Sequence, residues 1–184
     1  MDKFIPVVVI KELDEVDKIL PALKANGINC AEITFRTACA AEAIKLASEK
    51  YSEMNIGAGT VINAKQCKDA ISAGAKFIVS PGLSKGAAKV CKKKNIPYYP
   101  GCVTPTEIIE ALELGITTVK FFPANIYGGL AALKALSAPF PQVKFIPTGG
   151  VDRSNIDEFL AFDKVAAIGG SFFVKESLER KENK

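Results

Sequence analysis

The chain has 184 residues, 48% of them hydrophobic and 24% charged, which allows a sizeable buried core and makes disorder unexpected. The formal net charge is +4, but the basic residues are spread along the chain, so a nucleic-acid partner is not expected. Histidine is absent, which excludes histidine triads, histidine general bases and the common catalytic zinc sites. The five cysteines have no two-residue spacing and favour a reducing, cytoplasmic location. The apolar run Phe4–Ile10 is too short to cross a bilayer, so no membrane partner is expected.

Short apolar segments alternate with helical patterns from one end of the chain to the other. Eight of them are predicted strands: Phe4–Ile10, Cys30–Phe35, Asn55–Thr60, Phe77–Ser80, Pro97–Gly101, Thr118–Phe122, Lys144–Thr148 and Val165–Gly169. Between them lie seven predicted helices, at about Asp14–Asn26, Ala40–Tyr51, Ala64–Ala73, Ser84–Lys94, Thr104–Leu114, Gly128–Leu136 and Ser154–Leu160. The basic run Lys92–Lys94 is interpreted as the solvated end of a helix. Thr104 and Glu107 predict a capping box, and Gly27, Gly74 and Gly115 stand where C-terminal glycines belong.

The spacing of the strands favours a parallel barrel. They end at residues 10, 35, 60, 80, 101, 122, 148 and 169, so consecutive ends are 20–26 residues apart, the length of one β/α unit. Eight such units predict a single-domain (β/α)8 TIM barrel over residues 1–184, with short terminal extensions. A doubly wound open sheet stays as the alternative, because the pattern alone does not prove closure.

Polar residues gather at the carboxyl ends of the predicted strands, where barrels of this kind place their active sites. Glu32, Thr34 and Arg36 alternate with apolar residues, so they are expected on one face, toward the barrel interior. A carboxylate and a guanidinium there could transfer protons and clamp a carboxylate, or could form only a structural ion pair.

Lys120 lies in an otherwise apolar strand, Thr118–Phe122. In a closed barrel its ammonium could not simply project into water, and burial favours the neutral amine, a nucleophile toward carbonyls. The alternative is a lysine that reaches solvent from the strand end.

Two glycine pairs follow the last two strands: Gly149-Gly150 after Thr148, and Gly169-Gly170 before Ser171. Barrels build phosphate sites from backbone N–H groups at this place. Gly57-Ala-Gly-Thr60 lacks a dinucleotide fingerprint and is interpreted as a close backbone approach to substrate, with Thr60 as a hydrogen-bond donor. Ser80-Pro81-Gly82 could be a turn only.

Together these motifs resemble the 2-keto-3-deoxy-6-phosphogluconate (KDPG) aldolase and 4-hydroxy-2-oxoglutarate (KHG) aldolase family. The segments that carry the resemblance run in order from about Pro6 to Val174: Glu32-Ile-Thr-Phe-Arg36, Gly57-Ala-Gly-Thr60, Ser80-Pro-Gly82, Pro100-Gly101, Val119-Lys-Phe-Phe-Pro123, Pro147-Thr-Gly-Gly150 and Gly169-Gly-Ser171. One departure is that family members carry an extra helix before the first strand and a longer final helix.

The resemblance implies a class I aldolase, a lyase that cleaves KDPG to pyruvate and glyceraldehyde 3-phosphate and also acts on KHG. It implies Lys120 as the Schiff-base lysine and Glu32 as the general acid/base. Arg36 and Thr60 would hold the pyruvate carboxylate, with Pro81 lining the same pocket. The residues expected at the phosphate are Thr148, Gly149, Gly150, Gly169, Gly170 and Ser171. A homotrimer without metal or organic cofactor is expected. The alternatives are a 2-keto-3-deoxy-6-phosphogalactonate aldolase, a phosphate-binding barrel isomerase or decarboxylase without imine chemistry, and a non-catalytic binding barrel.

Overall fold

A computed structural model describes residues 2–182, in which eight strands alternate with eight helices. The strands are β1 Phe4–Val8, β2 Cys30–Thr34, β3 Asn55–Gly59, β4 Ile78–Val79, β5 Tyr98–Tyr99, β6 Thr118–Phe121, β7 Lys144–Pro147 and β8 Ile168–Gly170. The helices are α1 Glu15–Ala25, α2 Ala40–Lys50, α3 Ala64–Ser72, α4 Lys85–Lys94, α5 Pro105–Glu113, α6 Gly129–Ser137, α7 Ile156–Leu160 and α8 Phe172–Glu182. The predicted α/β class and unit order are confirmed.

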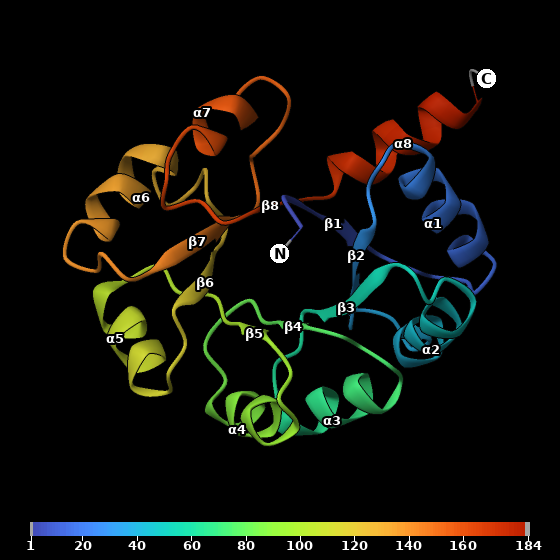
Figure 1. Ribbon diagram of the computed structural model, residues 1–184, viewed down its shortest axis with the longest axis horizontal. Coiled ribbons are helices and arrows are strands. Elements are labelled where there is room, and N and C mark those ends of the chain that lie inside the picture. The colour runs from blue at the N-terminus through green and yellow to red at the C-terminus, as the bar shows by residue number, and fades with distance from the viewer. Residues whose placement is uncertain (1, 183–184) are drawn as a thin grey trace.

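The strands close into a barrel. Parallel ladders join them in the order β5-β4-β3-β2-β1-β8, and a separate ladder joins β6 to β7. Two parallel bridges close the remaining gaps, Gly101 with Lys120 between β5 and β6, and Thr148 with Gly169 between β7 and β8. Figure 1 shows the helices as a ring around the strands. Closure excludes the open doubly wound sheet that the strand spacing had left as an alternative.

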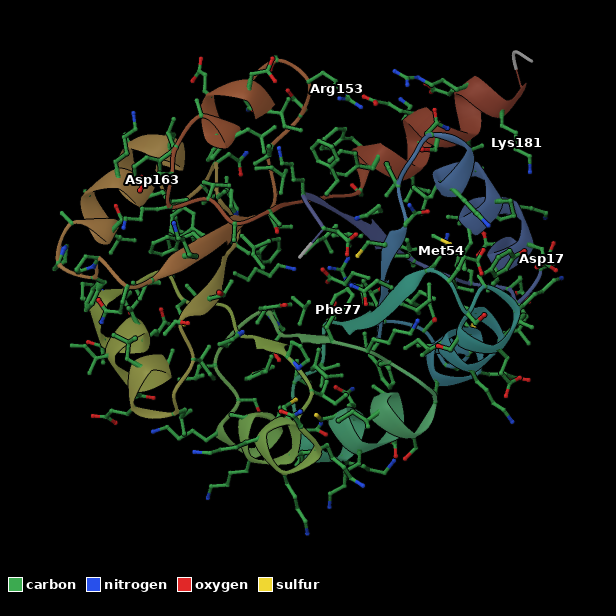
Figure 2. All side chains as sticks on the ribbon, viewed as in Figure 1. Asp17, Met54, Phe77, Arg153, Asp163 and Lys181 are labelled. Carbon is green, nitrogen blue, oxygen red and sulfur yellow. The ribbon has the colours of Figure 1, made fainter. Side chains whose placement is uncertain are left out.

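The apolar core has two layers. The larger one fills the space between strands and helices, and Ile33, on the outward face of β2, belongs to it. The smaller layer fills the lower barrel interior with six side chains from five strands or their extensions: Ile5, Cys30, Phe77, Val79, Ile146 and Ala167. Phe77 points toward the barrel centre in Figure 2. A packed interior is typical of this fold, so polar side chains in it need a reason.

Two differences from the predicted elements have physical causes. β4 and β5 are only two residues long, because Pro81, Pro97 and Pro100 flank them and cannot donate ladder hydrogen bonds. The helix α8 was not predicted. Its apolar and charged residues separate only weakly by helical period, and it follows a glycine pair that was interpreted as a loop. It forms because it packs on α1 and β1.

The predicted helix ends are confirmed. Thr104 and Glu107 form the capping box of α5, and Lys92–Lys94 make up the last turn of α4. Gly27, Gly74 and Gly115 all have positive φ. Within residues 2–182 no helix is long and apolar enough to span a membrane.

Candidate active site

A lysine and a glutamate are buried together inside the upper barrel. Lys120 Nζ lies 3.5 Å from Glu32 Oε1, and the two residues are 5% and 2% exposed. The backbone of Lys120 is held from both sides, since its N–H donates to Pro100 O at 2.8 Å and its carbonyl accepts from Cys102 N at 2.9 Å. Lys120 Nζ also lies 5.1 Å from the centre of the Phe122 ring. The predicted interior position of both charged groups is therefore confirmed.

The position of the Glu32 carboxyl depends on close contact with β3, and its pKa depends on burial and on nearby charges. A Cβ atom on Gly59 would lie 2.0 Å from Glu32 Oε1, so only glycine leaves room for the carboxyl against β3. Burial raises the pKa of Glu32, while the charges of Lys120 and Arg36 oppose that rise. A carboxylate whose proton affinity is increased by burial is suited to accepting and returning a proton during a reaction.

Arg36 and Thr60 meet just beyond the ends of β2 and β3. Arg36 Nε donates to Thr60 Oγ1 at 3.1 Å, and the Arg36 side chain is exposed. Thr60 has a φ of 57°, an unusual conformation for a β-branched residue. The guanidinium is directed toward Thr60, leaving Glu32 bonded to Lys120. A simple Glu32–Arg36 ion pair, the alternative drawn from the sequence, is not formed among the described residues.

The glycine pair that follows β7 and the pair that ends β8 lie side by side. Gly149 and Gly150 have φ values of 85° and 74°, the left-handed region that favours glycine. Gly169 stands against Thr148, because a Cβ atom there would meet Thr148 Oγ1 at 2.2 Å. Ser171 directly precedes α8, an 11-residue helix, so backbone N–H groups of its first turn face the same region.

One cavity of about 250 Å³ brings most of the predicted residues together. Seven of them line it: Arg36, Lys120, Thr148, Gly149, Gly150, Gly170 and Ser171. Glu32, Thr60 and Gly169 join it through their contacts with Lys120, Arg36 and Thr148. Pro81 does not line this cavity. It borders a separate hollow with Ile62, Gly82, Leu83 and Ser84.

Five lining residues were not predicted: Val7, Val9, Phe122, Val151 and Phe172. For β1 and the two residues after it a signal existed, since Val7 and Val9 alternate with Val8 and Ile10, which pack in the outer core. Phe122 likewise follows Lys120 by two residues. These apolar side chains form the walls that limit water around the lysine.

Thr34 is a further polar residue in the interior. It is fully buried, and its hydroxyl has no hydrogen-bond partner within residues 2–182. A buried hydroxyl without a partner costs about 1–3 kcal/mol. Strand alternation in the sequence places Thr34 on the same face of β2 as Glu32, but Thr34 was not among the expected site residues.

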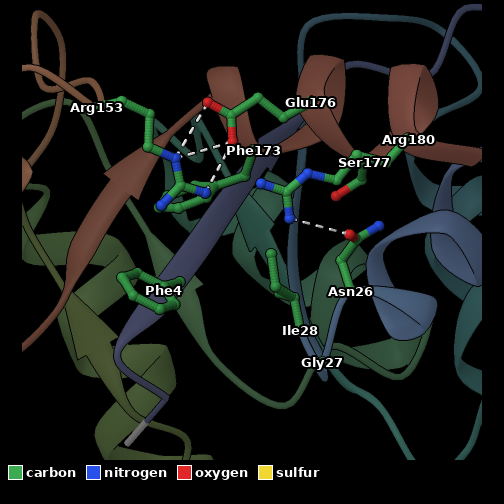
Figure 3. A pocket seen from close by; sticks show the side chains of 9 residues that line it. All are labelled: Phe4, Asn26, Gly27, Ile28, Arg153, Phe173, Glu176, Ser177 and Arg180. Atoms are coloured by element: carbon green, nitrogen blue, oxygen red, sulfur yellow. Dashed lines mark hydrogen bonds and ion pairs between the residues drawn. The ribbon is translucent and has the colours of Figure 1, made fainter.

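A second, smaller cavity of about 110 Å³ lies between β1, the α1–β2 loop and α8 (Figure 3). Its two arginines are already engaged. Arg153 binds Glu176 through two nitrogens, at 2.7 and 2.9 Å, and Arg180 Nη1 donates to Asn26 Oδ1 at 3.4 Å. Neither Lys120 nor Glu32 reaches it. Nor do residues 2–182 hold any cluster of three or more acidic or cysteine side chains placed for a metal ion.

Fold and site thus define a class: a β/α barrel with a buried amine–carboxylate pair beside two glycine pairs at its carboxyl mouth. The model of the KDPG and KHG aldolase family matches residues 1–184. A 2-dehydro-3-deoxy-phosphogluconate aldolase of Treponema pallidum is 42% identical over 94% of the chain and 82% of its own length. The KHG/KDPG aldolase of Escherichia coli K12 is 41% identical over 92% of the chain and 80% of its own length. The chain belongs to the KDPG and KHG aldolase family and is a lyase.

Solved structures of KDPG aldolases align with nearly the whole chain. A KDPG aldolase from Legionella pneumophila, with pyruvate captured at low pH as a covalent carbinolamine intermediate, is 42% identical. It aligns with a TM-score of 0.91 over 98% of the chain and 88% of its own. The KDPG aldolase of Zymomonas mobilis with 3-phosphoglycerate is 35% identical, with a TM-score of 0.90 over 99% and 92%. A 3-keto-L-gulonate-6-phosphate decarboxylase at 16% identity and a TM-score of 0.69 shares the fold alone.

Proposed function

We propose that this aldolase cleaves KDPG to pyruvate and glyceraldehyde 3-phosphate through a Schiff base on Lys120. The observation that carries the proposal is the buried Lys120–Glu32 pair, 3.5 Å apart, beside a cavity rimmed by both glycine loops. The Legionella relative, which holds pyruvate as a covalent carbinolamine, supports a lysine nucleophile. The isomerase, decarboxylase and non-catalytic alternatives involve no imine chemistry, so trapping of an imine on Lys120 would distinguish the aldolase from all three.

The first step is attack of the Lys120 amine on the C2 ketone. Glu32 lies 3.5 Å from Lys120 Nζ, and burial raises the pKa of its carboxyl, which suits it to accept the proton that the reacting nitrogen releases. The carbinolamine then loses water to give a protonated imine, which draws electrons from the neighbouring C3–C4 bond. Phe122 and Val7 supply apolar walls to the cavity beside Lys120.

The second step breaks the carbon–carbon bond. Glu32, acting through a water molecule, takes the proton of the C4 hydroxyl as the C3–C4 bond opens, and the electron pair moves into an enamine. Glyceraldehyde 3-phosphate leaves, and the enamine takes a proton at C3. Hydrolysis of the imine then releases pyruvate and restores the Lys120 amine.

The remaining residues bind the two ends of the substrate. Arg36 and Thr60 hold the carboxylate of the pyruvyl half, a geometry that suits a planar guanidinium. Thr148, Gly149, Gly150, Gly169, Gly170 and Ser171 receive the phosphate with backbone N–H groups and hydroxyls. The part of Pro81 in the pyruvyl pocket rests on the family resemblance alone, since it borders another hollow.

A second substrate, KHG, follows from the same site. The E. coli relative is a KHG/KDPG aldolase. KHG has the same 2-keto carboxylate group, which Lys120, Arg36 and Thr60 would contact. Its products would be pyruvate and glyoxylate. We also propose that residues 1–184 form one barrel domain that acts in the cytoplasm as a homotrimer without metal or organic cofactor, which Schiff-base chemistry does not require. Light scattering in solution tests the trimer.

The deciding experiment is reduction with borohydride in the presence of pyruvate, followed by mass spectrometry of the intact chain and its peptides. One adduct is expected, on Lys120, while exposed lysines such as Lys92 stay unlabelled. Lys120→Arg keeps a positive charge but cannot form the imine, so adduct and cleavage should disappear together. Labelling on another lysine, or cleavage by Lys120→Arg at a comparable rate, overturns the proposal.

A further inference from the structure

The Thr34 hydroxyl is a buried polar group without a function in the cycle described so far. It is 0% exposed and unpartnered within residues 2–182. Other hydroxyls buried in the barrel are satisfied: Ser80 Oγ donates to Val61 O and accepts from the Tyr98 hydroxyl at 2.9 Å. A valine would fill the same space as Thr34 without the unpaired group, so the hydroxyl calls for a reason beyond packing.

Thr34 stands directly above the catalytic carboxyl. Glu32 and Thr34 are two residues apart on β2, so their side chains share the inward face, while Ile33 packs outward. The strand register pairs Thr34 with Gly59, the same residue against which Glu32 Oε1 leans. The carboxyl is therefore tilted from its own level of the barrel toward the level of Thr34.

The hydrogen bonding of Glu32 must change during the reaction. In the structure the Glu32 carboxyl accepts a hydrogen bond from Lys120 Nζ. An ammonium offers three N–H donors, but an imine nitrogen bonded to C2 keeps at most one, and the enamine nitrogen carries no charge. A carboxylate buried as deeply as Glu32 then needs another donor whenever it is ionised.

We propose that Thr34 is a positioning residue whose hydroxyl donates to the Glu32 carboxylate once Lys120 is bonded to substrate. The inference rests on the proposed Schiff-base function. Rotation about χ1 redirects a threonine hydroxyl without moving the strand. Thr34 thereby holds the carboxylate ionised and in place for the C4 hydroxyl, and its lack of a partner in the free enzyme keeps the donor available.

The surroundings leave few other candidates for this task. The charged groups that act on Glu32 are Lys120 from β6 and Arg36 beyond the end of β2. On the inward face, β1 places Val7 beside Glu32 and β3 places Gly57 there, and neither has a side-chain donor. Arg36 Nε is bonded to Thr60. Thr34 is thus the side-chain hydroxyl that β2 itself supplies next to Glu32.

The test compares Thr34→Val, which removes the hydroxyl at constant volume, with Thr34→Ser, which keeps it. In Thr34→Val, kcat for KDPG cleavage should fall about tenfold or more, the size expected for a hydrogen bond to a charged group, while KM stays within about twofold. The acidic limb of the kcat–pH profile should move to higher pH, because the ionised carboxylate has lost a donor. Thr34→Ser should restore both values, and the melting temperature of Thr34→Val should equal or exceed that of the parent.

The control is Ser80→Ala, which removes a satisfied hydroxyl and should lower the melting temperature without moving the acidic limb. If Thr34→Val folds poorly, Thr34→Ala gives the same kinetic comparison. A parental kcat and acidic limb in either variant overturns the proposal. Borohydride trapping of pyruvate separates the two hypotheses: adduct on Lys120 should persist in every Thr34 variant, whereas its absence from the parent enzyme refutes the Schiff-base function itself.

Discussion

The two ends of the active-site cavity are built by different means. At one end, charged side chains from distant parts of the sequence, Glu32 and Lys120, are buried together. At the other end, Gly149, Gly150 and Gly170 line the cavity beside Ser171, which is exposed. In the proposed mechanism, the proton transfers take place at the Glu32–Lys120 end, where burial changes the proton affinity of a carboxyl. The phosphate binds at the glycine end, where backbone N–H groups need only the correct conformation.

The largest effect should come from removing the base at the buried end. Glu32→Gln is expected to keep the fold and still form the pyruvate adduct, but to lower kcat by roughly 10²–10⁴-fold, the range for general acid/base catalysis. Stopped-flow or coupled assays of KDPG cleavage measure the loss. Nearly normal turnover would show that Glu32 only partners Lys120.

The dependence of kcat on pH also tests Glu32 as the base. Because burial raises the pKa of Glu32, the ionised base appears only at a pH above the usual carboxyl range, and kcat should rise through an acidic limb located there. In Glu32→Gln this limb should disappear from the residual activity. A limb that persists unchanged in the variant would assign it to another group.

A smaller effect is expected from displacing the base instead of removing it. In Gly59→Ala the new Cβ would lie 2.0 Å from Glu32 Oε1, so the carboxyl must move, and a shift of about 1 Å can cost roughly 10²-fold in rate. Gly82→Ala is the matched control, since nothing lies within 4 Å of a Cβ atom there. Equal activities of the two variants would contradict the tight seating of Glu32.

The smallest effect should appear at the open end. Ser171→Asp adds a negative charge beside the proposed phosphate site and should raise KM for KDPG by about tenfold, while cleavage of KHG, which has no phosphate, changes less. Ser52→Asp, an exposed position between α2 and β3, controls for the added charge. Equal losses on both substrates would place the phosphate elsewhere.

Much of the fold could be predicted from the sequence because it depends on local signals. The period of strands and helices, the capping box of Thr104 and Glu107, and the glycines at helix ends all act over a few residues. The prolines that shorten β4 and β5 act locally too, because each lacks the N–H group that would bond to a neighbouring strand. The helix α8 escaped prediction because packing on α1 and β1, and not its own pattern, stabilises it.

The sequence by itself determined which residue types were available for catalysis: without histidine, a lysine in an apolar strand and a glutamate on an alternating strand were the natural candidates. Only the tertiary structure decided that residues 88 positions apart meet at 3.5 Å, that Arg36 turns to Thr60, and that Pro81 borders a different hollow. It also decided that the Thr34 hydroxyl, on the same face of β2 as Glu32, has no hydrogen-bond partner among residues 2–182. Closure of the barrel sets these relations, because it alone fixes which strand ends face one another across the interior and how much water reaches them.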